Sequence, residues 1–392
     1  MATPTLADVV AALERVYPPA WADEGDPVGL VVGDLAADVH DVMFAVDPVM
    51  AVAQEAIDTK VDALIVHHPL FYKPVSAMPA HTPKGRVLHE LARHGIALYV
   101  AHTNADSPVR GVSESLAFAL GLDEVRPLVP HRSEPLDKVV TFVPAGRVQR
   151  MVDAMASAGA GALGDYDRCA FLIDGEGTFR PGPTSNPAIG TRGKVEVVAE
   201  TRIEMVLPRA ARDAVVDALR RAHPYEEPAF DVIELAGWSS DRGAGRLGLL
   251  RQPRTLRDFA DDVAHALPRT AIGPRVAGDL DRIVSVVAVA GGAGDFLLDD
   301  VRASGADVFV TSDLRHHPAS EFREHPGAPG LVDVPHWAAE WTWLPVAQDA
   351  LTAVLDQRGL AVKSEVSRIC TDPWNYRAAG ADERPRGAHA ES

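Results

Sequence analysis

Apolar runs that end abruptly in histidine or acid recur along this chain. Four such runs, rich in β-branched residues, cover residues 61–66, 98–101, 306–311 and 330–334. The polar residues that follow them are, in order, His67 and His68, His102 and Asp106, Asp313, and His336 and Glu340. Short apolar runs of this kind predict buried strands, and ligands in open α/β sheets bind at the carboxyl ends of strands. The pattern therefore predicts one site assembled from both ends of the chain.

The spacing between these runs predicts helices that alternate with the strands. In the first third we expect helices over about 48–59, 83–94 and 111–120, and strands at 42–46, 61–66 and 96–101. Asp47 is a candidate N-cap of the first helix, since Pro48 would then occupy its first position. Alternation of this kind predicts a parallel sheet with helices on its faces.

The residue pattern changes in the middle of the chain. Three prolines and several charges around 123–138 indicate a linker. The stretch 138–236 then predicts strand, helix, loop, strand, helix and strand, in which residues 174–193, rich in Gly, Pro, Ser and Thr, form the long loop. This order is typical of a small α+β insertion, and the strand–helix alternation resumes after it.

The predicted fold class is therefore α/β, with two βαβ-type halves forming one core and an α+β domain inserted between them. The predicted domains are an N-terminal half of a metal-binding core (1–130), the inserted domain (135–240), a C-terminal half of the core (241–372) and a polar, disordered tail (373–392).

Composition narrows the classes of function. The net charge of −17 disfavours a nucleic-acid partner, because such proteins usually carry a basic patch. No apolar run approaches the ~18 residues of a membrane span, and the N-terminus lacks the features of a secretory signal. Cys169 and Cys370 lie far apart, which fits a reducing compartment. We expect a cytoplasmic protein without membrane contact.

The histidines and acids at the strand ends are candidate metal ligands, since imidazole and carboxylate together suit first-row divalent metals. Adjacent side chains on an extended backbone point to opposite faces, so His67 and His68 would serve different ions unless the backbone turns at Pro69. The alternative is a polar strand terminus in which one histidine caps the next helix. His clusters with acids mark metal or catalytic sites, which favours the metal interpretation.

Two His-x₃-acid pairs extend this argument. On a helix, residues four apart share a face, so His336 and Glu340 can converge on one ion after Pro335. His102 and Asp106 have the same spacing. The segment that contains them is more typical of a loop, where the two need not both be ligands.

The remaining motifs are weaker. Asp313 is a candidate partner that fixes an imidazole tautomer, and His316 and His317 are candidates for substrate contact or for supporting ligands. The glycines of 243–248 resemble a dinucleotide fingerprint only superficially, because no clear strand precedes them; we expect them to permit close backbone passage. No nucleophile elbow or phosphate-binding loop is present, and no catalytic side chain is assigned.

Taken together, these stretches resemble the Nif-three-like family, also called dinuclear metal centre proteins or GTP cyclohydrolase 1 type 2 homologs. The matching stretches are residues 26–33, 65–71, 101–106 with 111–112, 245–248, 306–313 and 332–340. Residues 223–231 resemble the inserted domain of the family's longer members, which is related in fold to the nitrogen-regulatory and CutA-type trimeric proteins. The similarity covers residues 5–370.

The resemblance implies two α/β halves facing each other across a site for two divalent ions (Zn, Fe, Mn, Co or Ni), in a toroidal homohexamer. The ligands it implies are His67, His68, Asp106, His336 and Glu340, with Glu340 or Asp106 as the bridge. His102 lies in the motif but outside that ligand set, so it is assigned, like Asp313, to supporting the ligands. The departures are Pro335, where the family has Gly, and Ser312, where it has Gly in Thr-Gly-Asp; neither removes a ligand.

Two hypotheses of function follow. The first is a metal-dependent hydrolase acting on a nucleotide or another phosphate-containing small molecule, because two bridged ions can generate hydroxide and hold a substrate oxygen. The alternative is a non-catalytic metal-binding scaffold, metallochaperone or regulatory hexamer. Hydrolysis assays with different metals, and the tightness of metal retention, distinguish them.

Overall fold

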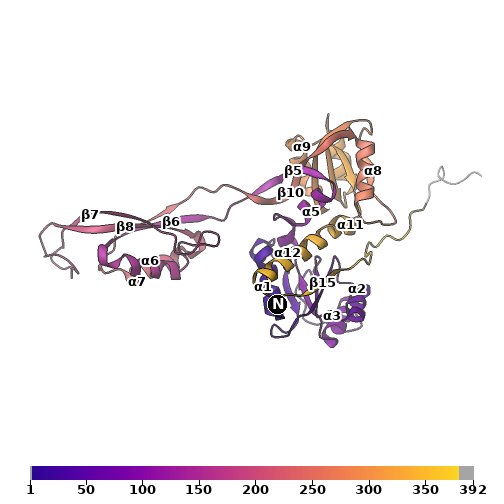
Figure 1. The fold of residues 1–392 in the computed structure, drawn as a ribbon. Coiled ribbons are helices and arrows are strands. Elements are labelled where there is room, and N and C mark those ends of the chain that lie inside the picture. Colours follow the sequence, from indigo (N-terminus) through magenta and orange to yellow (C-terminus); the bar gives the residue numbers. More distant parts are fainter. Residues whose placement is uncertain (1, 379–392) are drawn as a thin grey trace, which may run out of the picture. The chain divides into compact units, whose positions relative to one another are not determined.

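The computed structural model describes residues 2–378, and the chain divides into two compact units. Unit 1 consists of Met1–His131 and Asp241–Ser392, and unit 2 is Arg132–Ser240. Figure 1 shows the elements of each unit. The tail predicted to be disordered lies, from residue 379 onward, outside the described residues.

The first sheet of unit 1 has the order β1-β4-β3-β2-β15, with three parallel pairings and β1 antiparallel to β4. Its strands are β1 (Gly29–Val32), β2 (Asp41–Ala45), β3 (Ala63–Val66), β4 (Ala97–Val100) and β15 (Lys363–Val366). The helices of this half are α1 (Leu6–Val16), α2 (Met50–Thr59), α3 (Pro83–Arg93) and α12 (Trp343–Gln357). β3 is buried at every position because both faces of the sheet are covered.

The second sheet of unit 1 has the order β11-β14-β13-β12-β10-β5, with β12, β13 and β14 parallel. Its strands are β5 (Leu122–Arg132), β10 (Ser239–Thr255), β11 (Arg275–Ala277), β12 (Ile283–Ala293), β13 (Val308–Ser312) and β14 (Gly330–Asp333). Its helices are α8 (Leu256–Ala266), α9 (Leu298–Ser304), α10 (His316–Glu324) and α11 (His336–Trp341), and α4 (Thr103–Asp106) and α5 (Val112–Ala119) lie between the halves in sequence.

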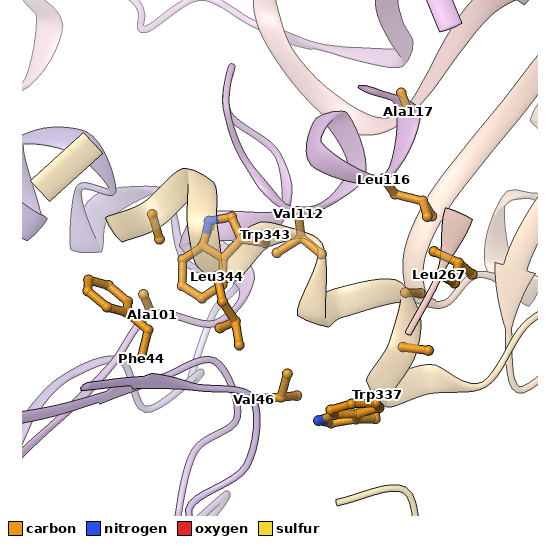
Figure 2. Packing of buried hydrophobic residues seen from close by; sticks show 14 of the residues in the cluster. Phe44, Val46, Ala101, Val112, Leu116, Ala117, Leu267, Trp337, Trp343 and Leu344 are labelled. Atoms are coloured by element: carbon orange, nitrogen blue, oxygen red, sulfur yellow. The ribbon is translucent and has the colours of Figure 1, made fainter. Parts of the chain in front are cut away.

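One core joins the two sheets of unit 1. Figure 2 shows Trp343 and Leu344 of α12 among buried side chains such as Phe44 and Val46. The Trp343 indole donates to the hydroxyl of Tyr17 at 3.0 Å, which satisfies its one polar atom. The ends of the chain therefore pack together, as the sequence predicts.

Unit 2 has a four-stranded antiparallel sheet in the order β7-β8-β6-β9 with two helices, the β-α-β-β-α-β arrangement of ferredoxin-like folds. Its strands are β6 (Leu136–Pro144), β7 (Phe171–Phe179), β8 (Glu196–Pro208) and β9 (Phe230–Glu234), and its helices are α6 (Val148–Ser157) and α7 (Arg212–Ala222). The unit has the predicted α+β class.

Two predicted connections are strands instead. Residues 123–138, expected as a linker, contain most of β5, and the expected loop 174–193 begins only after β7. Both are edge strands of their sheets. An edge strand tolerates Pro127 and Pro130, since one side of its backbone needs no partner. The Gly-containing part of β7 from residue 174 takes its conformation from pairing with β8.

The glycines of 243–248 belong to β10 and permit close packing, as expected. A Cβ at Gly243 would lie 2.3 Å from the carbonyl oxygen of Val129. Among the described residues, no helix is long and apolar enough to cross a membrane.

Candidate metal centre

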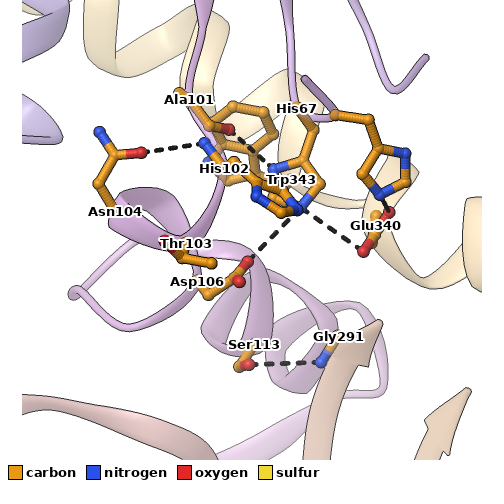
Figure 3. A network of polar contacts seen from close by, with 12 residues as sticks. His67, Ala101, His102, Thr103, Asn104, Asp106, Ser113, Gly291, Glu340 and Trp343 are labelled. Carbon is orange, nitrogen blue, oxygen red and sulfur yellow. Dashed lines mark hydrogen bonds and ion pairs between the residues drawn. The ribbon is translucent and has the colours of Figure 1, made fainter. Parts of the chain in front are cut away.

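The predicted strand ends meet in unit 1. His67 and His68 follow β3, and His102 follows β4 and is the N-cap of α4, which ends at Asp106. The other sheet contributes α11, which begins at His336 and carries Glu340. Figure 3 shows His67 between Asp106 and Glu340.

Glu340 lies at the centre of this cluster. Its side chain is only 4% exposed, and three imidazoles approach it through Nε2. His336 Nε2 lies 2.7 Å and His67 Nε2 3.5 Å from Oε1, and His68 Nε2 lies 3.0 Å from Oε2. Asp106 Oδ1 lies 3.5 Å from the same His67 nitrogen. One carboxylate thus faces three rings from two sheets.

Each imidazole is held at its other nitrogen. The acceptors that face the Nδ1 atoms are the Ala101 carbonyl for His67 (2.8 Å), Asp47 for His68 (2.7 Å), Asp26 for His102 (2.9 Å) and Asp313 for His336 (2.7 Å). In a neutral ring, an Nδ1–H that donates in this way leaves the Nε2 lone pair free. Metal-binding histidines in proteins are oriented by such partners.

Two of these acceptors have a role that the sequence did not predict. Asp47, the candidate N-cap of α2, does not cap it: the helix begins at Met50 with Val49 as N-cap, and the carboxylate instead accepts from His68. Asp26, in a motif that had no assigned role, accepts from His102 and from the hydroxyl and backbone N–H of Thr103. Asp313 has the predicted place beside an imidazole.

The loop after Asp106 is held by a buried arginine. Arg246 of β10 is 1% exposed, and its guanidinium donates to the carbonyls of Ser107 (2.8 Å) and Pro108 (2.6 Å). It also donates to the carbonyls of Gly243 and Gly245. These bonds tie the second half of the chain to the segment that positions Asp106, which gives the Gly245–Gly248 motif a structural role.

The charged groups in the cluster shift one another's pKa values. Burial alone would lower the pKa of His68 and of His336. Glu340 outweighs it together with Asp47 at His68 and with Asp313 at His336, which raises the pKa of His68 to about 11 and that of His336 to about 9. The pKa of Glu340 lies well below its usual range, because the three imidazoles outweigh its burial. Burial and the neighbouring His67 lower the pKa of His102, which favours a neutral ring.

Two observations show that these residues suit a metal ion. Nε2 of His336 and Oε2 of Glu340 are buried without a hydrogen-bond partner, although each has a charged neighbour within 3.0 Å. Buried polar atoms are normally satisfied, and these two would be satisfied as ligands. Gly292 of β12 leaves the space beside them open, since a Cβ there would lie 2.7 Å from Glu340 Oε1.

The donor atoms form two groups that are compact enough for an ion. One contains His67, His68 and His102, and the other His68, His336 and Glu340. Four residues of the predicted ligand set belong to these groups, and the fifth, Asp106, lies 3.5 Å from His67. His102, predicted to support the ligands, has a donor atom in the first group. His316 and His317 start α10, and within the described residues neither joins these groups.

Comparisons with known proteins agree with this architecture. The family model Duf34/NIF3 (NGG1p interacting factor 3) matches residues 4–373. GTP cyclohydrolase 1 type 2 homologs are similar to this chain at 46% identity in Mycobacterium bovis (94% of this chain, 96% of that protein) and 36% in Bacillus subtilis (94% and 97%). The chain belongs to the Duf34/NIF3 family.

Solved structures show the same fold. A Bacillus cereus protein related to NIF3 matches with a TM-score of 0.77 at 35% identity, covering 96% of this chain and 100% of that chain. The Staphylococcus aureus protein SA1388 matches with a TM-score of 0.80 at 28% identity and the same coverage.

Proposed function

We propose that this protein is a metal-dependent hydrolase whose histidine–carboxylate cluster holds two divalent ions, and that its substrate is a nucleotide or another phosphate-containing small molecule. The observation that carries the proposal is the buried Glu340 carboxylate, which has three imidazole Nε2 atoms within 3.5 Å. The substrate class is extended from relatives that are named GTP cyclohydrolase 1 type 2 homologs.

The arrangement of donors supports two ions rather than one. The two groups overlap at His68, whose single free nitrogen, Nε2, can bind only one of the two ions. The carboxylate of Glu340 has two oxygens and lies next to donors of both groups. Glu340 is therefore placed to bridge, and Asp106, 3.5 Å from His67, completes the first group. On this geometry we assign His102 to the first group as a ligand. Mixed nitrogen and oxygen donors suit Zn, Fe, Mn, Co or Ni.

Two metal ions held by these residues would supply hydroxide near neutral pH and would polarise a substrate oxygen. The chain's own residues decide where that chemistry takes place. Asp47, Asp26 and Asp313 hold three of the rings in one tautomer, and the Trp343 ring, 5.3 Å from the His67 ring, packs behind the centre. Preorganised ligands cost no rearrangement when the substrate binds.

The test is hydrolysis of a panel of nucleotides and phosphoesters by protein loaded with Mn, Fe, Co or Zn. We expect His336→Ala to lose bound metal and to reduce turnover more than about 100-fold, since it removes a ligand. His265→Ala, at an exposed histidine of α8, is the matched control and should keep both. Unchanged turnover in His336→Ala would overturn the proposal, and tight retention of metal without any turnover would instead support a non-catalytic metal-binding protein.

We also propose that the chain assembles into the homohexamer that its resemblance implies. Large apolar side chains of unit 2 that are 44–67% exposed support this assembly: Phe171, Leu172, Ile173, Val195 and Val197. Three of them lie on the edge strand β7, which also has unpaired backbone groups. Exposed apolar clusters of this kind mark interaction sites.

A further inference from the structure

A cavity of about 470 Å³ adjoins the proposed metal centre. The segment after β3 and the beginnings of α2 and α3 form its walls. His68 and Asp47 line it, so a molecule that fills the cavity contacts a proposed ligand and the acid that orients it. A volume of this size suits a small-molecule site.

Two cationic side chains in this cavity have no acidic partner. Lys84 and Arg86, in the first turn of α3, line it, and in the described part of the chain neither forms an ion pair. The Lys84 ammonium instead lies 5.6 Å from the centre of the Tyr72 ring. The one carboxylate in the wall, Asp47, is occupied by His68 and by the hydroxyl of Thr371. The cavity therefore offers unneutralised positive charge in a protein whose net charge is −17.

An aromatic ring connects the cations with the cluster. Tyr72 is 56% exposed, and its ring lies 5.8 Å from the His102 ring on one side and close to Lys84 on the other. Val49, Leu70 and Val87 supply apolar wall beside it. A ligand with an anionic group at one end and a planar ring beside it would match the two cations and the Tyr72 ring.

We propose that the cavity binds the phosphate end of a nucleotide substrate. The phosphate pairs with Lys84 and Arg86, since both cations pair readily with phosphate, and the rest of the molecule extends past Tyr72 toward His68. This inference rests on the proposed function and names the residues that would select phosphate-bearing substrates for it.

The test is calorimetric binding of GMP, AMP and inorganic pyrophosphate, with guanosine and adenosine as phosphate-free counterparts. The double variant Lys84→Met, Arg86→Met should weaken binding of the phosphate compounds about tenfold or more, the usual size of a lost charged hydrogen bond, and leave the metal content unchanged. Lys73→Met, at an exposed lysine in the connection between β3 and α3 and outside the cavity wall, is the matched control and should bind as the unmodified protein does.

Each binding experiment is run on metal-free and on Mn²⁺-loaded protein, which separates this inference from the proposed function. Phosphate binding that depends on Lys84 and Arg86 but is followed by no turnover would contradict the hydrolase alone. Equal binding by the double variant, or no preference of the unmodified protein for GMP over guanosine, would overturn the phosphate site.

Discussion

At the scale of single residues, the centre depends on where each imidazole points. Four rings have an acceptor at Nδ1, and three of these acceptors are carboxylates far away in sequence. Removing one acceptor should weaken metal binding without removing a ligand, because the ring loses its fixed tautomer and orientation.

Asp313→Asn tests this role. Asp313 has φ of 54°, a left-handed conformation that asparagine tolerates, so the backbone should not change. We expect the affinity for Mn²⁺ or Zn²⁺ to fall about tenfold, because the negative charge at His336 is lost. Asp295→Asn, at a partly buried acid paired with Arg315, should leave the affinity unchanged. Equal affinities of the two variants would contradict an orienting role for Asp313.

Metal binding should also release protons. At pH 7 to 8, His68 and His336 are protonated in the metal-free protein, since their pKa values are about 11 and about 9. A metal ion needs the Nε2 lone pair, so binding expels these protons and the affinity rises as the pH rises toward those values. Titration calorimetry in buffers of different ionisation enthalpy measures the number released; binding with no proton release would contradict this electrostatic account.

Sequence alone could locate the candidate ligands but not all of their hydrogen-bond partners. His336 and Glu340 share a helix face, so their convergence is predictable from spacing. Asp26 is 76 residues from His102, and only the folded sheet brings them together. Asp47 carries a local signal for a helix cap, and the pairing with His68 overrides it.

At the scale of elements, β12 shapes the site although it supplies no ligand. Gly292 has φ of 72°, and a side chain there would meet Glu340. Gly292→Ala should therefore cost about 1–2 kcal/mol of stability through backbone strain and, in addition, displace the Glu340 carboxylate and reduce bound metal.

Gly305→Ala is the control that separates these two effects. Gly305 has φ of 81°, and a Cβ there has nothing within 4 Å. It should lose a similar amount of stability in urea unfolding but keep its metal in elemental analysis. Full metal content in Gly292→Ala would show that the open space beside Glu340 has no function.

The elements that sequence predicts best are the central strands. β3 and β13 are buried at every position, and their apolar, β-branched sequences predict this burial. β5 and β7 were not predicted because edge strands take their conformation from pairing with a neighbouring strand. Their prolines or glycines are typical of loops.

At the scale of the whole molecule, the chain returns to unit 1 after a long insertion. The cluster contains residues from the segment before the insertion and from the segment after it. The order of motifs predicts this union, because α/β halves place their ligands at strand ends. What the pattern could not supply is the distance of His102 from the other rings: its ring centre lies 5.2 Å from that of His67 and 5.7 Å from that of His68.

The assembly can be tested in unit 2. Phe171→Asp puts a charge on an exposed apolar edge strand, so we expect light scattering to show dissociation of the proposed hexamer into smaller species. Trp374→Asp changes an equally exposed aromatic residue in unit 1 and should leave the mass unchanged. A monomeric unmodified protein would contradict the proposed assembly.

The central claim is that Glu340 and the surrounding imidazoles hold two ions. Anomalous diffraction from crystals of protein purified without added metal tests it most directly. The account predicts two peaks, each about 2.0–2.2 Å from its ligand atoms, on either side of the Glu340 carboxylate and with one of them bound by His68 Nε2. No peak among these side chains, or peaks located elsewhere on the chain, would contradict it.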